Sequence, residues 1–346
     1  MATIAVVTST PPLTEGGHLV IARALVRALE EAGHQAGLVT TPSNRFGRQG
    51  AAYVANWFTD VGVTGEGQPV DQVITLRYPS YAVRHPRHVC WLNHTMREYY
   101  DLWDRFSAGL SPQGRFKESI RRRIMHAADT YCFKHHVTRL FAQSEAVKAR
   151  LQKWNGVSAR VLHPPPPQRP YRCDGYGDYL FFVSRLSPLK RTDLVLQALA
   201  RPEAEGVRLV IGGDGEDRPR LERLSRELGL DRRVTFAGPL TEEKLLEHLA
   251  RCRAVVFVPL QEDFGFVTVE AFASAKAVIT CTDSGGPLDL VASGETGFVV
   301  APAAARLAAA CAELAANRDL AEQMGRAAQA RAAALSWSTV ISQLVL

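Results

Sequence analysis

Two glutamates separated by seven residues give the strongest chemical signal in this chain. Glu262 follows the apolar run at residues 254–260, which is typical of a buried strand, and Glu270 falls inside the expected next helix. Eight helical steps span about 12 Å, roughly the distance from a sugar ring to a ribose across a diphosphate. Glu262 can then accept hydrogen bonds from sugar hydroxyls and Glu270 from ribose hydroxyls. Two solvated glutamates near a helix start are the alternative interpretation.

Between these glutamates, Gly265 and Phe266 fall at the expected start of the helix. Glycine lets the backbone approach a ligand closely. The first turn of a helix offers free N–H groups and a positive dipole end to a phosphate. We therefore predict that Gly265 and Phe266 contribute to a substrate-binding surface.

Two cations follow the first apolar run of the second half, within residues 184–191 (SRLSPLKR). Arg185 and Lys190 both leave the end of a strand, where together they can neutralise a departing diphosphate without a metal ion. A surface loop with ordinary charges is the alternative interpretation. Gly213 and Asp214, in the loop GGDGE, follow the next strand, and residues 283–289 (DSGGPLD) follow a later one. Glycine-rich turns are weak signals singly, but all of these loops fall at the carboxyl ends of strands in one sheet.

The first half offers fewer candidates. Gly16 and Gly17 immediately precede the first helix, where a glycine pair can cradle a phosphate or simply form a flexible turn. His94 follows the run HVCWL, and a polar histidine at a strand end suits contact with a sugar hydroxyl or a structural role.

These motifs resemble family 4 of the retaining GT-B glycosyltransferases. The resemblance covers nearly all of the second half, where the motifs occur in the family's order and spacing, and is thinner in the first half. Many members have Gly-Gly-x-Pro-Glu where this chain has Gly-Gly-Pro-Leu-Asp at residues 285–289. That variant looks like some mannosyltransferases that use GDP-mannose.

The resemblance implies a fold and residue roles. The fold would be α/β of the GT-B type, with two Rossmann-like domains whose parallel sheets face each other across a cleft. Arg185 and Lys190 resemble the ligands of the donor diphosphate, Glu262 the glutamate beside the donor sugar and Glu270 the one that binds ribose. Gly17 resembles the glycine against the diphosphate, and His94 a histidine that contacts the donor sugar.

The resemblance also implies a reaction. A hexosyl group would move from a nucleotide-diphosphate sugar, GDP-mannose or a UDP-sugar, to a hydroxyl acceptor with retention of configuration. The leaving phosphate oxygen would take the acceptor's proton, and the protein would supply positioning and charge stabilisation. The sequence contains no Asp-x-Asp motif and no Cys-x-x-Cys pair. We therefore expect no cofactor and no metal ion.

The elements that must position these residues alternate between strands and helices, as in parallel sheets covered on both faces. In the first half we expect strands at residues 3–8, 35–40, 72–76, 88–92 and 140–143, and helices at 18–32 and 117–134. In the second half we expect strands at residues 179–184, 207–211, 234–236, 254–258 and 277–280, helices at 192–199, 218–228, 242–250 and 268–275, and an alanine-rich helical end.

A proline-rich stretch at residues 163–178 interrupts this pattern and is interpreted as a linker. It divides an acceptor-side domain, residues 1–165, from a donor domain, residues 166–335. We expect residues 336–346 to form a helix that packs back toward the first domain. Ligands of such sheets bind beyond the carboxyl ends of the strands. Acceptor contacts are expected from first-half loops at residues 42–53 and 96–114.

The charge is uneven. Residues 1–165 contain 20 Lys and Arg against 12 Asp and Glu, whereas residues 166–346 contain 21 against 23. No apolar run of about 18 residues occurs and the N-terminus lacks a basic region, so we expect a cytoplasmic protein with neither a membrane span nor a signal peptide.

A predicted helix in the basic half suggests where in the cell the protein acts. Over residues 119–134 the helical period places Ile120, Ile124 and Tyr131 on one arc, predicted to pack on the sheet. Arg122, Arg123, His126 and Lys134 share the opposite arc, predicted to form an outward basic ridge. The ridge is either a solvated face or a peripheral contact with the anionic inner face of a membrane, near a lipid-linked acceptor. A soluble acidic acceptor is a third explanation of the charge.

Three other functions are weighed. A nucleotide-sugar epimerase of the same fold is disfavoured by the ordered Arg/Lys and Glu-x7-Glu motifs. A dehydrogenase is disfavoured because no G-x-G-x-x-G follows the first strand. A non-catalytic nucleotide-sugar-binding subunit stays open, since the sequence does not separate binding from turnover.

Overall fold

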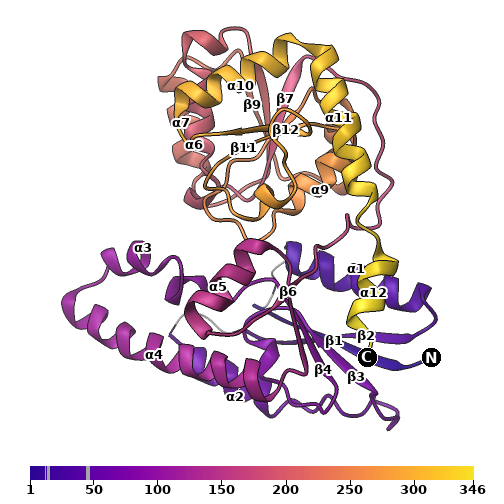
Figure 1. The fold of residues 1–346 in the computed structure, drawn as a ribbon. Coiled ribbons are helices and arrows are strands. Elements are labelled where there is room, and N and C mark those ends of the chain that lie inside the picture. The colour runs from indigo at the N-terminus through magenta and orange to yellow at the C-terminus, as the bar shows by residue number, and fades with distance from the viewer. Residues whose placement is uncertain (12, 14–15, 44–46) are drawn as a thin grey trace. The chain divides into compact units, whose positions relative to one another are not determined.

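The chain folds into two compact units in the computed structural model, which describes residues 1–11, 13, 16–43 and 47–346. The first unit comprises Met1–Pro167 and Ser336–Leu346, and the second comprises Gln168–Leu335. Each unit contains a sheet of six parallel strands with helices around it, as Figure 1 shows. The expected α/β class with parallel sheets is confirmed.

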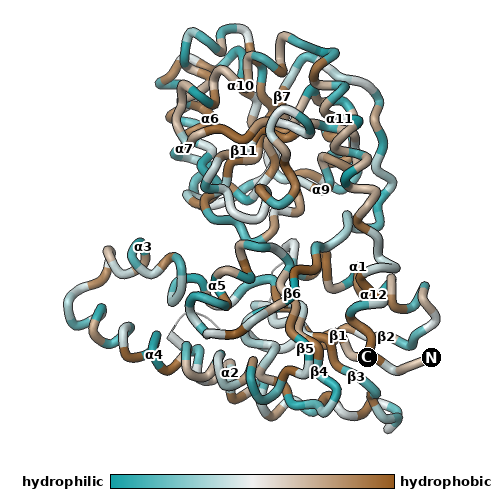
Figure 2. Tube along the Cα trace, in the orientation of Figure 1, coloured by the Kyte–Doolittle hydropathy of each residue, from teal (hydrophilic) through white to brown (hydrophobic). Residues whose placement is uncertain are grey.

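The first unit has the strand order β2-β1-β3-β4-β5-β6. Its strands are β1 (Thr3–Thr10), β2 (Gln35–Pro42), β3 (Gln72–Thr75), β4 (His88–Leu92), β5 (Arg139–Ala142) and β6 (Arg160–Val161), and its helices are α1 (Gly17–Glu31), α2 (Gln49–Trp57), α3 (Trp103–Ala108), α4 (Pro112–His135), α5 (Glu145–Asn155) and α12 (Trp337–Leu344). The central strands β3 and β4 are buried along their whole length. This fits a sheet covered on both faces, and Figure 2 shows hydrophobic residues along these strands.

The second unit has the strand order β12-β11-β10-β7-β8-β9. Its strands are β7 (Tyr179–Val183), β8 (Arg208–Gly212), β9 (Val234–Gly238), β10 (Val255–Val256), β11 (Val278–Cys281) and β12 (Gly297–Val300), and its helices are α6 (Thr192–Leu199), α7 (Arg218–Glu227), α8 (Glu242–Arg251), α9 (Phe266–Ala273), α10 (Ala304–Ala316) and α11 (Arg318–Ala333). Leu180 and Phe182 of β7 enter one hydrophobic cluster, whereas Phe181 enters another. Alternate side chains therefore build cores on opposite faces of the sheet.

Some expected loops contain helices. Residues 42–53 include the first turns of α2, and residues 44–46 of that stretch lie outside the described residues. Residues 96–114 include α3 and the first turn of α4. The prediction of plain loops at these positions was wrong, because α2 and α3, with 9 and 6 residues, are too short to show a clear apolar period and α4 begins before residue 117.

The orientation predicted for α4 was also wrong. Ile120, Ile124 and Tyr131, predicted to face the sheet, are exposed. Arg122, predicted to face outward, donates from Nε to the carbonyl oxygen of Tyr99 (2.7 Å) and lies against the rings of Trp103 and Trp154. Polar and aromatic partners on the inner side of α4 therefore bind its charged residues there. The helix faces the opposite way from the orientation that hydrophobicity alone predicts.

The rest of the inner face of α4 is polar as well. Glu118 accepts from Tyr99 Oη (2.5 Å), and Asp129 accepts from Tyr81 Oη and Tyr100 Oη. Both carboxyl groups are buried, and burial raises the pKa of Asp129 well above its usual range. Of the predicted basic ridge, Arg123 and Lys134 do remain exposed.

The C-terminal helix α12 packs within the first unit, beside α1 in Figure 1. The side chain of Gln72 donates to the carbonyl oxygen of Leu344 (2.6 Å) and accepts from the N–H of Leu346 (2.9 Å). Trp337 donates from Nε1 to the carbonyl oxygen of Pro166 (3.2 Å), and its ring meets Trp91 edge-on. The chain thus returns to the first unit after completing the second.

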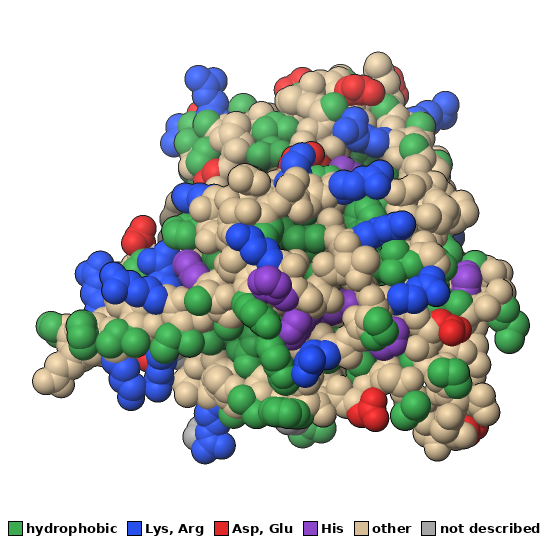
Figure 3. All heavy atoms as spheres, turned by 60° about the horizontal axis from the view of Figure 1, so that its bottom comes forward, with side chains coloured by type: hydrophobic (Ala, Val, Ile, Leu, Met, Phe, Trp, Pro, Cys, Tyr) green, Lys and Arg blue, Asp and Glu red, His purple; other side chains and the backbone are tan. Residues whose placement is uncertain are grey.

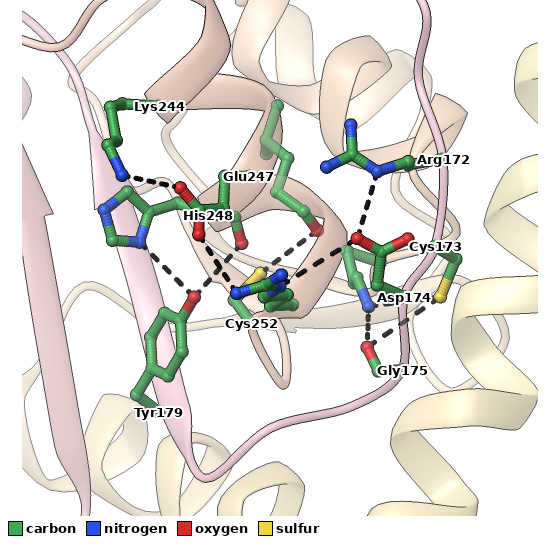
Figure 4. Close-up of polar contacts among 12 residues, drawn as sticks. Arg172, Cys173, Asp174, Gly175, Tyr179, Lys244, Glu247, His248 and Cys252 are labelled. Atoms are coloured by element: carbon green, nitrogen blue, oxygen red, sulfur yellow. Dashed lines mark hydrogen bonds and ion pairs between the residues drawn. The ribbon is translucent and has the colours of Figure 1, made fainter.

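Residues 168–178, the second part of the proline-rich stretch, pack on the second unit without forming a strand or helix. Asp174 pairs with Arg172 Nε (3.0 Å), and its N–H donates to the carbonyl oxygen of Ala250 at the end of α8 (2.9 Å). Figure 4 shows this region, with the Lys244–Glu247 pair and the Tyr179–His248 contact beside it. These contacts hold the segment to the end of the sheet where β7 begins.

Candidate functional site

The strand order of the second sheet creates a switch point between β7 and β10, where the connections run in opposite directions. The loop after β7 carries Lys190, and the loop after β10 carries Glu262. Their side chains form an ion pair. Both are about four-fifths buried, and Lys190 Nζ lies 5.6 Å from the centroid of the Phe257 ring. The structure therefore joins two predicted catalytic residues at the place where sheets of this type bind ligands.

Arg185 also lies in the loop after β7, but its side-chain partner is Glu216 and not Glu262. Its side chain is 74% exposed and its Nη2 lies 3.5 Å from Oε2 of Glu216. Such an exposed pair holds the guanidinium only weakly. Arg185 is therefore able to turn toward an anion without breaking a buried contact.

The loop that carries Glu262 is hydrogen-bonded to the loop after β11. The N–H of Glu262 donates to the carbonyl oxygen of Ser284 (2.8 Å), and the N–H of Gly286 donates to the carbonyl oxygen of Glu262 (2.9 Å). Gly285 has φ +76°, and a Cβ on Gly286 would lie 2.5 Å from the Cα of Phe264. This close approach requires glycine and fixes the backbone beside Glu262.

The GGDGE loop packs equally tightly on the loop after β7. Gly213 has φ +112°, and a Cβ there would lie 2.0 Å from the carbonyl oxygen of Ser184. The N–H of Leu186 donates to the carbonyl oxygen of Asp214 (2.9 Å). The Asp214 side chain is half-exposed and accepts from the N–H of Gly215. Gly213 therefore acts through loop packing, and Asp214 lies open to solvent.

Gly265 and Phe266 lie at the start of α9. Gly265 is the residue before the helix, with φ +83°, and a Cβ there would lie 2.7 Å from the Phe257 ring. Phe266 is the first helical residue, and its ring meets Phe264 edge-on. The helix starts two residues earlier than expected, so its free N–H groups follow directly after the Glu262 loop.

Glu270 lies in α9 and is buried. It accepts from Nη1 of Arg169 and from Oη of Tyr171 (3.1 Å), while Arg169 Nε also pairs with Glu242 (2.9 Å). Burial raises the pKa of the Glu270 carboxyl, and the Arg169 charge and the Tyr171 hydroxyl oppose that shift. The residue predicted to bind ribose thus has internal partners from the proline-rich stretch.

Arg191 was not predicted as a site residue. It adopts the left-handed conformation, with φ +52°. Its guanidinium forms two hydrogen bonds to Asp283 (2.7 and 2.8 Å) and donates to the carbonyl oxygens of Val258 (2.7 Å) and Pro259 (2.9 Å). One side chain therefore connects the loops that follow β7, β10 and β11.

The three candidates of the first half lie in the first unit. Gly16 and Gly17 are at the start of α1, where the N–H of Leu19 donates to the carbonyl oxygen of Gly16 (3.0 Å). His94 follows β4, with Nδ1 2.7 Å from the carbonyl oxygen of Thr95. Both positions are at the carboxyl edge of the first sheet, the edge at which parallel sheets bind ligands.

No sequence pattern predicted site roles for Arg169, Tyr171 and Arg191. The first two belong to a proline-rich stretch without periodicity, and Arg191 is one more cation in a basic loop. Their partners lie 67 to 101 residues away in the chain, so only the fold brings them together. Among the residues that the structure describes, no group of three or more His, Cys, Asp and Glu side chains could hold a metal ion.

Residues 172–331 match the family model described as Glycosyl transferases group 1. Curated relatives include D-inositol 3-phosphate glycosyltransferases from Nocardia farcinica, 38% identical over 168 residues, and from Streptomyces avermitilis, 34% identical over 175 residues. These alignments cover 45% and 46% of this chain but 37% of each relative. The chain therefore matches well under half the length of these relatives.

Solved structures resemble the chain over nearly its whole length. Sucrose-phosphate synthase from Thermosynechococcus elongatus aligns with a TM-score of 0.76 at 19% identity, covering 98% of this chain and 97% of that one. WaaG, a glycosyltransferase involved in lipopolysaccharide biosynthesis, aligns with a TM-score of 0.70 at 17% identity, covering 99% of each chain. At such identities the likeness establishes the fold, which is GT-B. The comparisons thus show a GT-B fold and a match of residues 172–331 to the Glycosyl transferases group 1 model.

Proposed function

We propose that this protein is a retaining, metal-independent glycosyltransferase that moves a hexosyl group from a nucleotide-diphosphate sugar to a hydroxyl acceptor. The donor would be GDP-mannose or a UDP-sugar. The observation that carries the proposal is the Lys190–Glu262 ion pair at the switch point of the second sheet, surrounded by closely packed glycine loops. The match of residues 172–331 to the Glycosyl transferases group 1 family supports it.

The proposed roles follow from charge and position. Lys190 is a partly buried cation paired with Glu262, so it would stabilise the charge that develops on a leaving diphosphate. Arg185, exposed on the same loop, would add a second positive charge. Glu262 would accept hydrogen bonds from the donor sugar, and its pairing with Lys190 orients its carboxylate for that task.

Glu270 is proposed to bind the ribose. Its carboxylate has further acceptor capacity beyond the bonds from Arg169 and Tyr171, since an ionised carboxylate has about four acceptor sites. Gly17 and His94 are proposed to meet the diphosphate and the donor sugar from the first unit. No protein nucleophile is proposed. The acceptor hydroxyl would attack on the face that the leaving group departs from and pass its proton to the leaving phosphate oxygen.

The acceptor is proposed to be lipid-linked. The excess of positive charge in residues 1–165 supports contact with an anionic surface. The likeness of fold to WaaG, whose described role is in lipopolysaccharide biosynthesis, is in keeping with this. Among the described residues no helix is both long and apolar enough to cross a bilayer.

Calorimetry with a panel of UDP- and GDP-sugars tests the donor site. We expect one nucleotide series to bind, and Lys190→Ala to weaken binding by roughly tenfold or more, the effect of losing a charge-assisted hydrogen bond worth about 1.5–3 kcal/mol. Arg208→Ala is the matched control. Arg208 is an exposed cation of the same sheet, but it lies at the amino-terminal end of β8, away from the carboxyl ends of the strands. Equal weakening in both variants, or no binding by the wild-type protein to any member of the panel, would refute the assignment.

A further inference from the structure

An apolar stripe runs along the outer face of α4. Phe116, Ile120, Ile124 and Tyr131 recur every four to seven residues, which keeps them on one side of a helix. Phe116 is 71% exposed and Ile124 is 62% exposed. Soluble domains rarely expose such a row, and contiguous apolar patches mark surfaces that bind proteins or membranes.

Positive charge borders this stripe. Arg115, Lys117, Arg123 and Lys134 are exposed residues of α4. Figure 3 shows the hydrophobic row at the left, with Lys and Arg side chains on both sides of it. The acidic residues of α4, a helix that the structure describes from end to end, are Glu118 and Asp129, and both are buried. The exposed face of the helix therefore carries apolar and basic side chains and no acidic one.

Helix α2 extends the apolar surface. Trp57, its last residue, stacks on Tyr131 of α4 with ring centroids 6.0 Å apart. Val54 and Phe58, one helical turn apart at the end of α2, are exposed, Phe58 by 80%. We name these six exposed apolar residues the α2–α4 face: Val54, Phe58, Phe116, Ile120, Ile124 and Tyr131.

A cavity of about 640 Å³ opens within this face, and both Phe58 and Tyr131 line it. Its other lining residues include Arg84, His135 and His136, and no acidic residue is among the described residues that line it. The Arg84 guanidinium lies 5.7 Å from the centroid of the Trp57 ring. The cavity therefore combines aromatic walls with donors suited to a phosphate.

We propose that the α2–α4 face docks on an anionic membrane, with its apolar side chains among the acyl chains and the cavity holding a lipid phosphate headgroup. An interfacial helix of this kind combines aromatic and aliphatic side chains on its buried side with Lys and Arg beside them. The basic residues of α4 are then at the height of the headgroups, where each contributes about a fivefold gain in affinity. The proposal does not depend on the identity of the sugar donor.

A second copy of the chain fits this face poorly. In a twofold dimer the same patch meets itself, so the basic borders of the two copies would oppose each other. Like charges placed together across an interface disfavour association. An anionic lipid surface supplies the opposite charge and accommodates the apolar row at the same time.

Co-sedimentation with vesicles tests the proposal on the full chain. We expect binding to vesicles of phosphatidylcholine mixed with phosphatidylglycerol, weak binding to phosphatidylcholine alone, and loss of binding at high salt because screening shortens the attraction. Phe116→Ser combined with Ile124→Ser should reduce binding roughly tenfold or more, since two apolar side chains no longer leave water. Arg84→Gln should reduce binding to the anionic vesicles roughly fivefold and leave binding to neutral vesicles unchanged.

Matched controls separate the face from general effects. Val63→Ser removes an exposed apolar residue of the first unit outside the α2–α4 face, and Arg226→Gln removes an exposed cation of the second unit. Both should bind like the wild-type protein. The proposal is overturned if the wild-type protein ignores anionic vesicles at low salt, or if the Phe116/Ile124 variant binds as well as wild type. It is also overturned if the protein sediments as a dimer that this variant dissociates. Arg84→Gln with unchanged binding would remove the headgroup assignment of the cavity.

Discussion

Lys190 and Glu262 are 72 residues apart in the chain and meet because β7 and β10 are neighbours in the sheet. Each side chain keeps about a fifth of its surface exposed, so solvent and ligands can still reach the pair. A diphosphate at this position would compete with Glu262 for the lysine. Under the proposed function, the ion pair would hold both groups in place until a donor binds.

Glu270 differs, because its partners belong to the fold. Burial raises the pKa of its carboxyl, while Arg169 lowers it. Because the pKa of Glu270 is higher in the folded protein than in the unfolded chain, the folded protein binds more protons between the two pKa values. The free energy of unfolding therefore falls as the pH rises from the unfolded-state pKa through the folded-state pKa. Removing Arg169 should raise the pKa further and enlarge the effect.

We therefore predict that Arg169→Ala lowers the free energy of unfolding more at neutral than at acid pH. The difference from wild type should approach about 3–5 kcal/mol at neutral pH, the cost of leaving a buried charge unpaired. Urea unfolding at a series of pH values measures it. The Arg169→Ala/Glu270→Gln double variant is the control and should lose this pH dependence. A deficit in Arg169→Ala that is the same at every pH would contradict the account.

At the scale of elements, the site is built from loops that pack backbone against backbone. Gly213 and Gly286 each leave no room for a Cβ, and Arg191 connects three of the loops. This packing holds together the loops that follow β7, β8, β10 and β11. Rigid loops of this kind cost less to order when a ligand binds.

A glycine pair tests that packing. Gly213→Ala should destabilise the second unit by several kcal/mol, because its Cβ would lie 2.0 Å from a carbonyl oxygen at a left-handed φ. Gly206 also has a positive φ, at +80°, but a Cβ there would have nothing within 4 Å, so Gly206→Ala should cost only about 1 kcal/mol. Thermal unfolding followed by circular dichroism compares them. Equal losses would mean that conformation, not loop contact, determines the effect.

Periodicity predicted much of this architecture. The helix expected at residues 192–199 and the strand at 88–92 are confirmed with the same bounds by α6 and β4, because each is a strongly apolar segment between clear turn signals. β12 was missed, since its four residues follow a glycine-rich stretch inside an otherwise helical end. The predicted orientation of α4 was the opposite of the observed one. Tyrosine hydroxyls hydrogen-bond to the buried carboxyl groups of Glu118 and Asp129, and a helical period does not reveal such partners.

The site was predictable to a similar extent. Arg185, Lys190 and Glu262 follow strands whose carboxyl ends share one edge, so their joint placement could be inferred. The pairing of Glu270 with Arg169 could not, because the two residues are 101 positions apart and one lies in a stretch without secondary structure. Contacts of that kind depend on tertiary packing alone.

At the scale of the whole molecule, the two units differ in character. The second matches a glycosyltransferase family model over most of its length, and its charge is close to neutral. The first carries the excess of Lys and Arg and the exposed α2–α4 face. This division is consistent with the two proposals, a nucleotide-sugar site on the second unit and a membrane-docking face on the first.

Release of nucleoside diphosphate from donor sugars in excess EDTA tests the central claim most directly. We predict that the wild-type protein releases it slowly from one member of a UDP- and GDP-sugar panel, and that Lys190→Ala and Arg185→Ala each lower the rate by roughly 10²-fold, the effect of losing one preorganised charge stabiliser. Arg208→Ala should keep the wild-type rate. No release from any donor, or release abolished by EDTA and restored by Mg²⁺ or Mn²⁺, or equal rates in all variants, would contradict a metal-free transfer supported by these two cations.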